Sequence, residues 1–216
     1  MGLGKGLKTL PNFPNQMFVT GTDTDVGKTM VSAMLTLGLG AAYWKPVQSG
    51  TEPMTDTERV RSLTHLDASH FLPERFCLSQ PLSPHAAAEK DGVAIALSDF
   101  QIPQHTKSHL IIEGAGGLMV PLNRHDYMID LIQQLQIPVC LVARSTLGTI
   151  NHTLLSIEQL RRTSIPIMGV ILNGPKNKGN REAIAHYGQV PILGELEWID
   201  PVTPERLKHL FHQQFG

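Results

Sequence analysis

The chain has 216 residues, of which 41% are hydrophobic and 17% are charged, and its formal net charge at pH 7 is −1. This composition excludes a globally disordered chain, and the length suits a single domain with one core. The balanced charge leaves no basic excess for nucleic acid or an anionic membrane surface, so neither is an expected partner.

The two cysteines of the chain, Cys77 and Cys140, form neither a disulfide framework nor a metal-ligand spacing. No apolar stretch reaches the ~18–20 residues that a membrane-spanning helix needs. Residues 1–15 lack the apolar core of a signal peptide. We therefore expect a flexible N-terminal extension over residues 1–15, a single domain over residues 16–216, and a reducing cytoplasm as the compartment.

Short apolar runs alternate along the chain with longer segments of helical periodicity. In chain order, the pattern predicts a strand at 17–20, a helix at 28–39, a strand at 41–47, a helix at 56–65, a strand at 109–113, a helix at 127–135, a strand at 138–143, a helix at 149–162, strands at 167–172 and 191–193, and a helix at 204–213. Residues 89–99 are ambiguous. This order predicts an α/β, P-loop NTPase-like fold, with a parallel sheet covered by helices on both faces. Ligands of such sheets bind in the loops that follow the strands.

The first of these loops, residues 21–29, reads Gly-Thr-Asp-Thr-Asp-Val-Gly-Lys-Thr between a strand and a helix, which is the context of a Walker A loop. Its backbone N–H groups would cradle phosphates, Lys28 would reach the β- and γ-phosphates, and the Thr29 hydroxyl would bind Mg²⁺. Five residues separate Gly21 from Gly27, one more than usual. A glycine-rich turn without a ligand is the alternative, which Gly-Lys-Thr after a strand disfavours. The expected phosphate contacts are Asp25, Val26, Gly27, Lys28, Thr29 and Met30.

Two further loops carry charged residues that suit the same site. Lys45 lies at the end of the second predicted strand and could bind an anionic intermediate or a transferring phosphate, although a solvated surface lysine is an equal alternative. Glu113 ends an apolar strand, where a P-loop enzyme places a second acid on the Mg²⁺ side; the alternative is an incidental acid in a turn. The residues that follow it, Gly114, Ala115 and Gly116, allow close approach of a ligand.

Three other positions have both a functional and a plain interpretation. Asp56 could hold the metal, since Mg²⁺ favours carboxylate oxygens, but its spacing alone favours an acid at a helix N-terminus. Asn173 and Gly174 could read a base or form an Asn-Gly turn, and the absence of Asn-Lys-x-Asp disfavours a GTPase. The helix start near Gly148 could bind a carboxylate, but a simple turn capped by Thr149 is the preferred interpretation.

Six sequence blocks together resemble the dethiobiotin synthetase family, in family order within residues 17–205. They are residues 21–29 with their five-residue spacing, Lys-Pro-Val-Gln-Ser-Gly at 45–50, Ser-Pro-His at 83–85, Glu-Gly-Ala-Gly-Gly-Leu-Met-Val-Pro-Leu at 113–122, Leu-Gly-Thr-Ile-Asn-His at 147–152 and Gly-Glu-Leu-Glu-Trp at 194–198. The first block contains a generic motif, whereas the second and fourth together are specific.

The resemblance implies an ATP-dependent ligase that acts on 7,8-diaminononanoate, CO₂ and MgATP. One amine captures CO₂ as a carbamate, and a carbamate oxygen attacks the γ-phosphate to give a carbamic–phosphoric anhydride. The second amine then closes the ureido ring and expels phosphate. The resemblance assigns Lys28 and Lys45 to charge stabilisation, and Thr29, Asp56 and Glu113 to Mg²⁺.

The same resemblance implies roles for residues elsewhere in the chain. Ser49 would contact the substrate, and the helix start from Gly148 to Asn151 would bind the substrate carboxylate of a neighbouring subunit, which implies a homodimer. The residues on the adenine side would be Asn173, Gly174, Glu197, Trp198, Ile199 and, as a weaker match, Glu205.

Two rival functions remain for a P-loop chain of this size. A MinD/ParA-type regulatory ATPase carries an additional lysine early in its P-loop and often a basic amphipathic helix at its C-terminus, and neither pattern is present here. A non-enzymatic nucleotide-binding module would leave Lys45 and Ser49 beside the phosphate loop unexplained. Neither rival accounts for all of the loops.

Overall fold

The computed structural model describes residues 13–216, so residues 1–12 of the expected N-terminal extension lie outside the described residues. Phe13, where the described chain begins, stacks on Phe211 and meets the edge of Phe215. Asn15 then accepts a backbone hydrogen bond from Leu110. Residues 13–15 are thus in contact with the folded domain.

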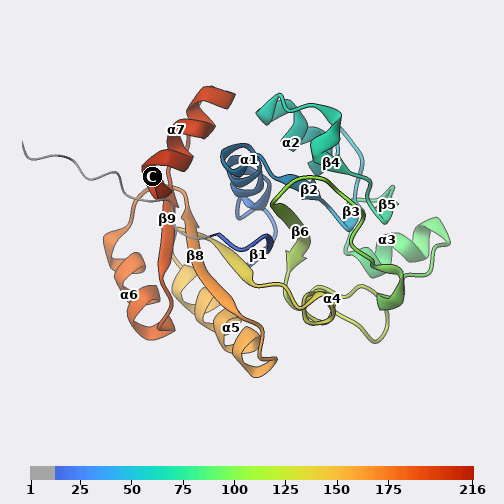
Figure 1. The fold of residues 1–216 in the computed structure, drawn as a ribbon. Coiled ribbons are helices and arrows are strands. Elements are labelled where there is room, and N and C mark those ends of the chain that lie inside the picture. Colours follow the sequence, from blue (N-terminus) through green and yellow to red (C-terminus); the bar gives the residue numbers. More distant parts are fainter. Residues whose placement is uncertain (1–12) are drawn as a thin grey trace, which may run out of the picture.

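A seven-stranded parallel sheet forms the centre of the fold (Figure 1), in the order β4-β2-β6-β1-β7-β8-β9. A separate two-stranded parallel sheet pairs β3 with β5. The strands are β1 (Gln16–Gly21), β2 (Ala42–Trp44), β3 (Val47–Ser49), β4 (Phe71–Leu72), β5 (Phe76–Leu78), β6 (Leu110–Gly117), β7 (Val139–Arg144), β8 (Ile167–Asn173) and β9 (Ile192–Leu196). Because β1 lies between β6 and β7, the loop that follows β1 is central to the carboxyl edge of the sheet.

Helices cover both faces of the large sheet and form two separate cores. Phe18 of β1 belongs to the core under α3, α4, α5 and α6, whereas its neighbours Met17 and Val19 belong to the core under α1, α2 and α7. This alternation follows from the period of two along a strand. The helices are α1 (Lys28–Leu39), α2 (Asp56–Thr64), α3 (Pro84–Asp91), α4 (Met128–Leu135), α5 (Thr149–Arg162), α6 (Lys178–Gly188) and α7 (Pro204–Phe215), with 3₁₀ turns η1 (Ala68–His70) and η2 (Leu97–Asp99).

The predicted fold class is confirmed, and the helices predicted at 28–39 and 149–162 match α1 and α5 at both ends. The single strand predicted at 41–47 is wrong, because the chain turns at Pro46 and its two halves join different sheets. The Pro46 carbonyl accepts the N–H groups of Arg75 and Phe76, which ties this turn to the start of β5. The sequence pattern also missed α6, β4 and β5, and it left α3 unassigned over most of its length.

Among residues 13–216, no helix combines the length and the apolar character that crossing a membrane requires.

Candidate active site

The phosphate loop connects β1 to α1 and contains two residues in the left-handed region. Asp25 has φ 54° and Gly27 has φ 97°. Gly27 is the N-cap of α1 and has no side chain to cap the first turn, so the N–H groups there point into the loop without a side-chain acceptor. A helix start of this kind binds anions through its N–H groups and its dipole. Met30, in the first turn of α1 and predicted to contact phosphate, packs its side chain against the core under α1, α2 and α7.

Lys28 folds back across the loop. Its Nζ donates a hydrogen bond of 2.9 Å to the carbonyl oxygen of Asp23. Burial, reinforced by the neighbouring Lys45 ammonium, lowers the pKa of Lys28 to about 8. The side chain therefore lies across the anion-binding concavity as a cation whose charge is sensitive to mildly alkaline pH.

The strongest electrostatic feature is a group of buried and half-buried side chains that we call the Lys45 cluster: Thr29, Tyr43, Lys45, Asp56 and Glu113. Lys45 Nζ lies 2.6 Å from Asp56 Oδ2 and 3.1 Å from Glu113 Oε1, and it donates a 3.0 Å hydrogen bond to the Gly114 carbonyl. Burial alone lowers the pKa of Lys45, but the carboxylates of Glu113 and Asp56 outweigh it and hold that pKa above its ordinary value. Burial raises the pKa of Asp56, and the Lys45 ammonium reverses this to a net lowering.

Thr29 and Tyr43 complete the cluster from either side of the carboxylates. Thr29 Oγ1 lies 3.1 Å from Asp56 Oδ1 and 3.0 Å from Glu113 Oε1. The Tyr43 hydroxyl donates a 3.1 Å hydrogen bond to Glu113 Oε2, and burial, followed by the Glu113 charge, raises the Tyr43 pKa well above its ordinary value. Tyr43 is therefore a fixed neutral donor that orients Glu113.

Sequence reasoning missed Tyr43 and Gln48. The available signal for Tyr43 was its place two residues before Lys45, which puts both side chains on one face of an extended chain. Gln48 Oε1 accepts the backbone N–H of Asp56 at 3.0 Å and so fixes the start of α2 beside the cluster. The capping box of Thr55 and Glu58 fixes the same helix end.

Glu113 does not end its strand, contrary to the sequence-based expectation. β6 continues to Gly117, whose register partner on β1 is Gly21, so the glycine-rich segment runs alongside the phosphate loop. Gly117 lies so close to the Gly21 carbonyl that a Cβ would sit 3.2 Å from that oxygen. Ala115 packs against the core, and Gly116 turns the chain with φ 62°.

The oxygens of Thr29, Asp56 and Glu113 form a donor set that fits a hard divalent cation such as Mg²⁺. Within residues 13–216 no group of three or more His, Cys, Asp and Glu side chains could hold a metal. A cation here would therefore take its remaining ligands from phosphate oxygens and water, as Mg²⁺ does in phosphoryl-transfer sites.

Ser49, the predicted substrate contact, ends β3. Its Oγ is buried and has no hydrogen-bond partner within the described part of the chain. An unpaired buried hydroxyl costs free energy unless a ligand or water satisfies it. The position is thus consistent with a group that a bound ligand completes.

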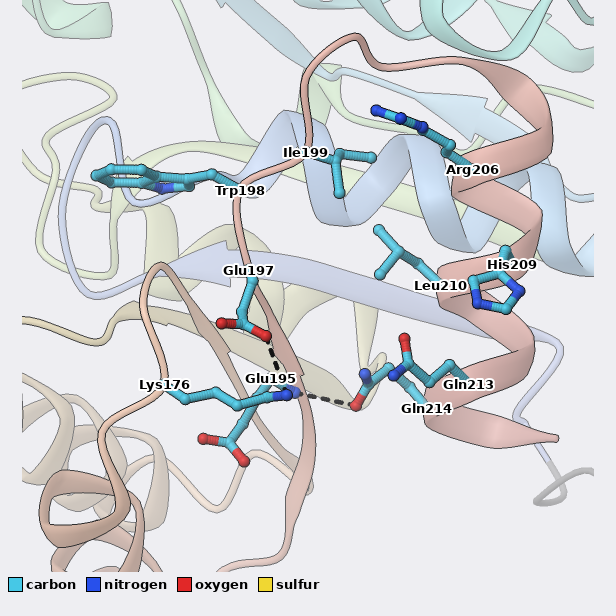
Figure 2. A pocket seen from close by; sticks show the side chains of 10 residues that line it. All are labelled: Lys176, Glu195, Glu197, Trp198, Ile199, Arg206, His209, Leu210, Gln213 and Gln214. Atoms are coloured by element: carbon cyan, nitrogen blue, oxygen red, sulfur yellow. Dashed lines mark hydrogen bonds and ion pairs between the residues drawn. The ribbon is translucent and has the colours of Figure 1, made fainter.

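Asn173 lies against the phosphate loop, where its Nδ2 donates a 3.0 Å hydrogen bond to the Val26 carbonyl. Gly174 follows with φ 125° beside Ser145. The more distant residues predicted on the adenine side, Glu197, Trp198 and Ile199, line a cavity of about 480 Å³ between the end of β9 and α7 (Figure 2). Glu205 lies in the first turn of α7 and does not line that cavity.

The walls of this cavity come from the loop between β8 and α6, from the end of β9 with the residues that follow it, and from α7 (Figure 2). Lys176, in the loop between β8 and α6, pairs through its Nζ with Oε2 of Glu197 at 3.0 Å, just after the end of β9. His209 and Gln213 lie on α7. Trp198 is 77% exposed at the mouth.

The predicted carboxylate-binding helix start follows β7, which neighbours β1 in the sheet. Gly148, with φ 91°, is the N-cap of α5, so the Thr149 cap of the preferred sequence interpretation is wrong. Thr149 instead lies inside the helix, with its hydroxyl 3.4 Å from that of Thr153. Asn151 is exposed, and Leu147 is 99% exposed. Among the described residues, no hydrogen bond joins the first turn of α5 to the Lys45 cluster.

Comparison with known proteins places this site in context. A family model described as an AAA domain matches residues 15–206. The chain is 49% identical over 201 residues to the ATP-dependent dethiobiotin synthetase BioD of Brucella ovis, covering 93% of this chain and 94% of that one. It is 50% identical over 187 residues to the protein of the same name from Paramagnetospirillum magneticum, covering 87% and 90%.

The similar solved structures are more distant. A ParA family ATPase from Chlorobium tepidum gives a TM-score of 0.57 at 11% identity, covering 94% of this chain and 98% of that one. The septum site-determining protein MinD of Pyrococcus horikoshii, complexed with Mg-ADP, gives 0.56 at 12% identity, covering 93% of each chain. At this identity the likeness shows a shared P-loop ATPase fold and carries no regulatory function over to this chain.

Proposed function

The chain belongs to the ATP-dependent dethiobiotin synthetases, within the AAA-domain family, and we propose that it carboxylates 7,8-diaminononanoate with CO₂ and closes the ureido ring with ATP. Such an enzyme is an ATP-dependent ligase that forms a C–N bond. The observation that carries the proposal for this chain is the Lys45 cluster beside the phosphate loop. The cluster places a buried lysine and two carboxylates beside the loop that carries Lys28, at one edge of the sheet.

The reaction balances in three steps. One substrate amine adds to CO₂ and loses a proton, which gives a carbamate. A carbamate oxygen attacks the γ-phosphorus of ATP, the bond to the β-phosphate oxygen breaks, and ADP leaves. The second amine then attacks the carbamate carbon and loses a proton, and the C–O bond to phosphate breaks. The second step brings two anionic groups together, the carbamate and the γ-phosphate, so the site must supply positive charge at fixed positions.

The phosphate loop supplies part of this charge. The uncapped first turn of α1 presents N–H groups to the phosphates, and Lys28 adds an ammonium from the same loop. Bound phosphate would favour the charged form of Lys28 and offset the lowering of its pKa by burial. Lys28 should therefore stay charged to a higher pH in the phosphate complex than in the free protein.

Lys45 supplies the second cation. In the described structure its ammonium neutralises Asp56 and Glu113. Mg²⁺, held by Thr29, Asp56 and Glu113, would supply charge neutralisation at the β- and γ-phosphates. The two carboxylates would then have a stronger counter-ion, and Lys45 would turn toward the carbamate and the γ-phosphate. One well-aimed donor of this kind is worth ~3–4 kcal/mol in the transition state.

The substrate's own groups bind around this centre. The unpartnered hydroxyl of Ser49 is suited to a substrate amine or carbamate, and the start of α5, from Gly148 to Asn151, is suited to its carboxylate. In line with the family resemblance, we assign that helix start to the site of a second subunit in a homodimer; among residues 13–216 it has no hydrogen bond to the Lys45 cluster. The nearly complete exposure of Leu147 and the exposure of Leu155 supply apolar surface for such contact.

The nucleotide base would lie toward β8 and β9. Asn173 and Gly174 adjoin the phosphate loop, and the exposed Trp198 offers a flat surface beside Glu197 and Ile199. Glu205 would close this side from the first turn of α7. We expect a cytoplasmic enzyme that acts on small molecules, without nucleic acid or membrane partners.

The proposal is tested by mixing the purified protein with MgATP, bicarbonate and diaminononanoate, and by measuring phosphate, ADP and dethiobiotin. We expect all three products in equal amounts, with dethiobiotin identified by mass spectrometry. Omission of the diamine should abolish phosphate release. ATP hydrolysis that ignores the diamine but responds to a protein partner would overturn the proposal in favour of a regulatory ATPase.

A further inference from the structure

Two side chains on neighbouring strands hold the phosphate loop at separate points. Arg144 ends β7 and Asn173 ends β8, and the two residues are register partners in the parallel pair. Arg144 Nη2 lies 2.9 Å from Asp23 Oδ2, near the start of the loop. Asn173 Nδ2 donates a 3.0 Å hydrogen bond to the Val26 carbonyl, just before Gly27. We call Arg144 and Asn173 the brace pair.

The segment between these two points has an uncommon backbone. Asp25 adopts φ 54°, a left-handed conformation that is strained for a non-glycine residue. Gly27, at φ 97°, lies so close to Asn173 that a Cβ would be 2.1 Å from its Nδ2. A strained conformation persists only where its surroundings hold it, and here both ends of the segment are held by the brace pair.

Arg144 has a second role, which concerns the charge of Asp23. One of its carboxylate oxygens accepts the Thr24 N–H at 2.7 Å, and the other faces Arg144. Without a counter-ion, this carboxylate would repel the phosphates that bind the same loop. Arg144 therefore both fixes the carboxylate and neutralises it.

We propose that Arg144 and Asn173 are positioning residues that hold the phosphate loop in its phosphate-binding conformation before the nucleotide arrives. The inference rests on the proposed function only in taking residues 21–29 to bind phosphate. The Arg144 and Asp23 side chains are each about half exposed, at 43% and 47%. An exposed ion pair adds little to folding stability, so the effect belongs to phosphate affinity.

The test uses inorganic tripolyphosphate with Mg²⁺, a ligand without a base, measured by calorimetry on the full chain. We expect Arg144→Ala to weaken its binding about threefold to fivefold, and Asn173→Ala by a similar factor, with melting temperatures close to the wild type. The matched control is Arg162→Ala, because Arg162 pairs with Glu158 at 3.2 Å on the exposed face of α5. This control should leave tripolyphosphate binding unchanged.

A double-mutant cycle identifies the mechanism. Asp23→Asn keeps the acceptor for Thr24 but removes the charge that Arg144 neutralises. If Arg144 acts through Asp23, Arg144→Ala should have almost no effect on tripolyphosphate affinity in the Asp23→Asn background. An equal loss in both backgrounds would overturn the role assigned to Arg144, because the arginine would then act on the ligand directly.

Steady-state kinetics distinguishes weaker ATP binding from a general loss of structure. Both brace variants should raise the KM for ATP while kcat stays within about twofold, since the loop rather than the reaction step is affected. Unchanged tripolyphosphate affinity with a reduced kcat would overturn the proposal for Arg144. For Asn173, weaker ATP binding with unchanged tripolyphosphate binding would assign the residue to the base alone. Tripolyphosphate binding stays informative even if dethiobiotin formation fails.

Discussion

The Lys45 cluster and the first turn of α5 differ in how complete each one is within a single chain. In the cluster, Lys45 and both carboxylates are buried or half-buried, and each is satisfied by partners from β2, α1, α2 or β6. At the start of α5, Leu147 and Asn151 face outward. The contrast fits our proposal that one chain organises the phosphoryl chemistry, whereas binding of the substrate carboxylate takes a second copy.

The largest effect is expected at the Lys45 cluster, the region that is complete within one chain. Lys45→Ala should lower turnover by about 10²–10³-fold, because one transition-state cation is lost from a water-poor site. It should also tighten binding of Mn²⁺ to the nucleotide-free protein, since Lys45 no longer competes for Asp56 and Glu113. Turnover and Mn²⁺ titration measure the two effects.

Circular dichroism serves as the control for folding of Lys45→Ala, since removal of one partner leaves buried carboxylates without a counter-ion. Lys90→Ala, at an exposed lysine near the end of α3, provides a control for loss of a positive charge. Unchanged turnover in Lys45→Ala would remove Lys45 from the mechanism. Weaker Mn²⁺ binding would show that Lys45 does not compete with the cation.

The second prediction concerns the start of α5, which we propose is completed by a second chain. Leu147→Asp should dissociate the proposed homodimer and reduce turnover about tenfold or more, because each site loses the helix start of its neighbour. Light scattering and turnover, measured across protein concentration, test this. Mixing Lys45→Ala with Asn151→Ala subunits should recover activity up to about a quarter of the wild type, since half the dimers then carry one intact site. Absence of recovery, with subunit exchange demonstrated, would place both residues in the same chain's site.

The third prediction concerns Lys28, in the phosphate loop beside the Lys45 cluster, whose pKa is about 8. The folded-state pKa lies below the unfolded value of 10.5, so burial of the charge destabilises the protein below pH 8 and this cost is relieved as pH rises toward 10.5. Phosphate binding requires the charged form, so tripolyphosphate affinity should fall about tenfold between pH 7 and pH 9. Lys28→Arg should remove this pH dependence, because arginine stays charged. A wild-type affinity that is flat over this range would contradict the assignment.

Much of the Lys45 cluster was predictable from the sequence, because Lys45 and Glu113 lie at the ends of predicted strands. The carboxyl ends of parallel strands meet at one edge, so the residues at or just after the ends of the predicted strands 17–20, 41–47 and 109–113 had to converge. Lys45 and Asp56 each had a plain alternative in the sequence, and their contact at 2.6 Å resolves both toward one cluster. The plain interpretation of Asp56 was also correct, since the residue opens α2.

The remainder was not predictable, because it depends on contacts that no local pattern encodes. α6 buries only Ile184 and Gly188, so its apolar periodicity is weak. Arg144 reaches Asp23 across 121 residues, and Tyr43 reaches Glu113 across 70. The turn at Pro46 divides a run that reads as one strand. Such features follow from packing between elements rather than from spacing within them.

The smallest expected effect tests whether Tyr43 contributes to the complete region only by orienting Glu113. Tyr43→Phe removes the hydroxyl and leaves Glu113 Oε2 buried without its donor, which should cost about 1–3 kcal/mol of stability and lower the melting temperature by several degrees. Turnover should fall about threefold, with a higher requirement for Mg²⁺, because the carboxylate is less well positioned. Tyr187→Phe, at a tyrosine that is 69% exposed, should change neither quantity. If Tyr43→Phe lowered stability but left the Mg²⁺ dependence unchanged, Tyr43 would support the fold without positioning the carboxylate that faces Lys45.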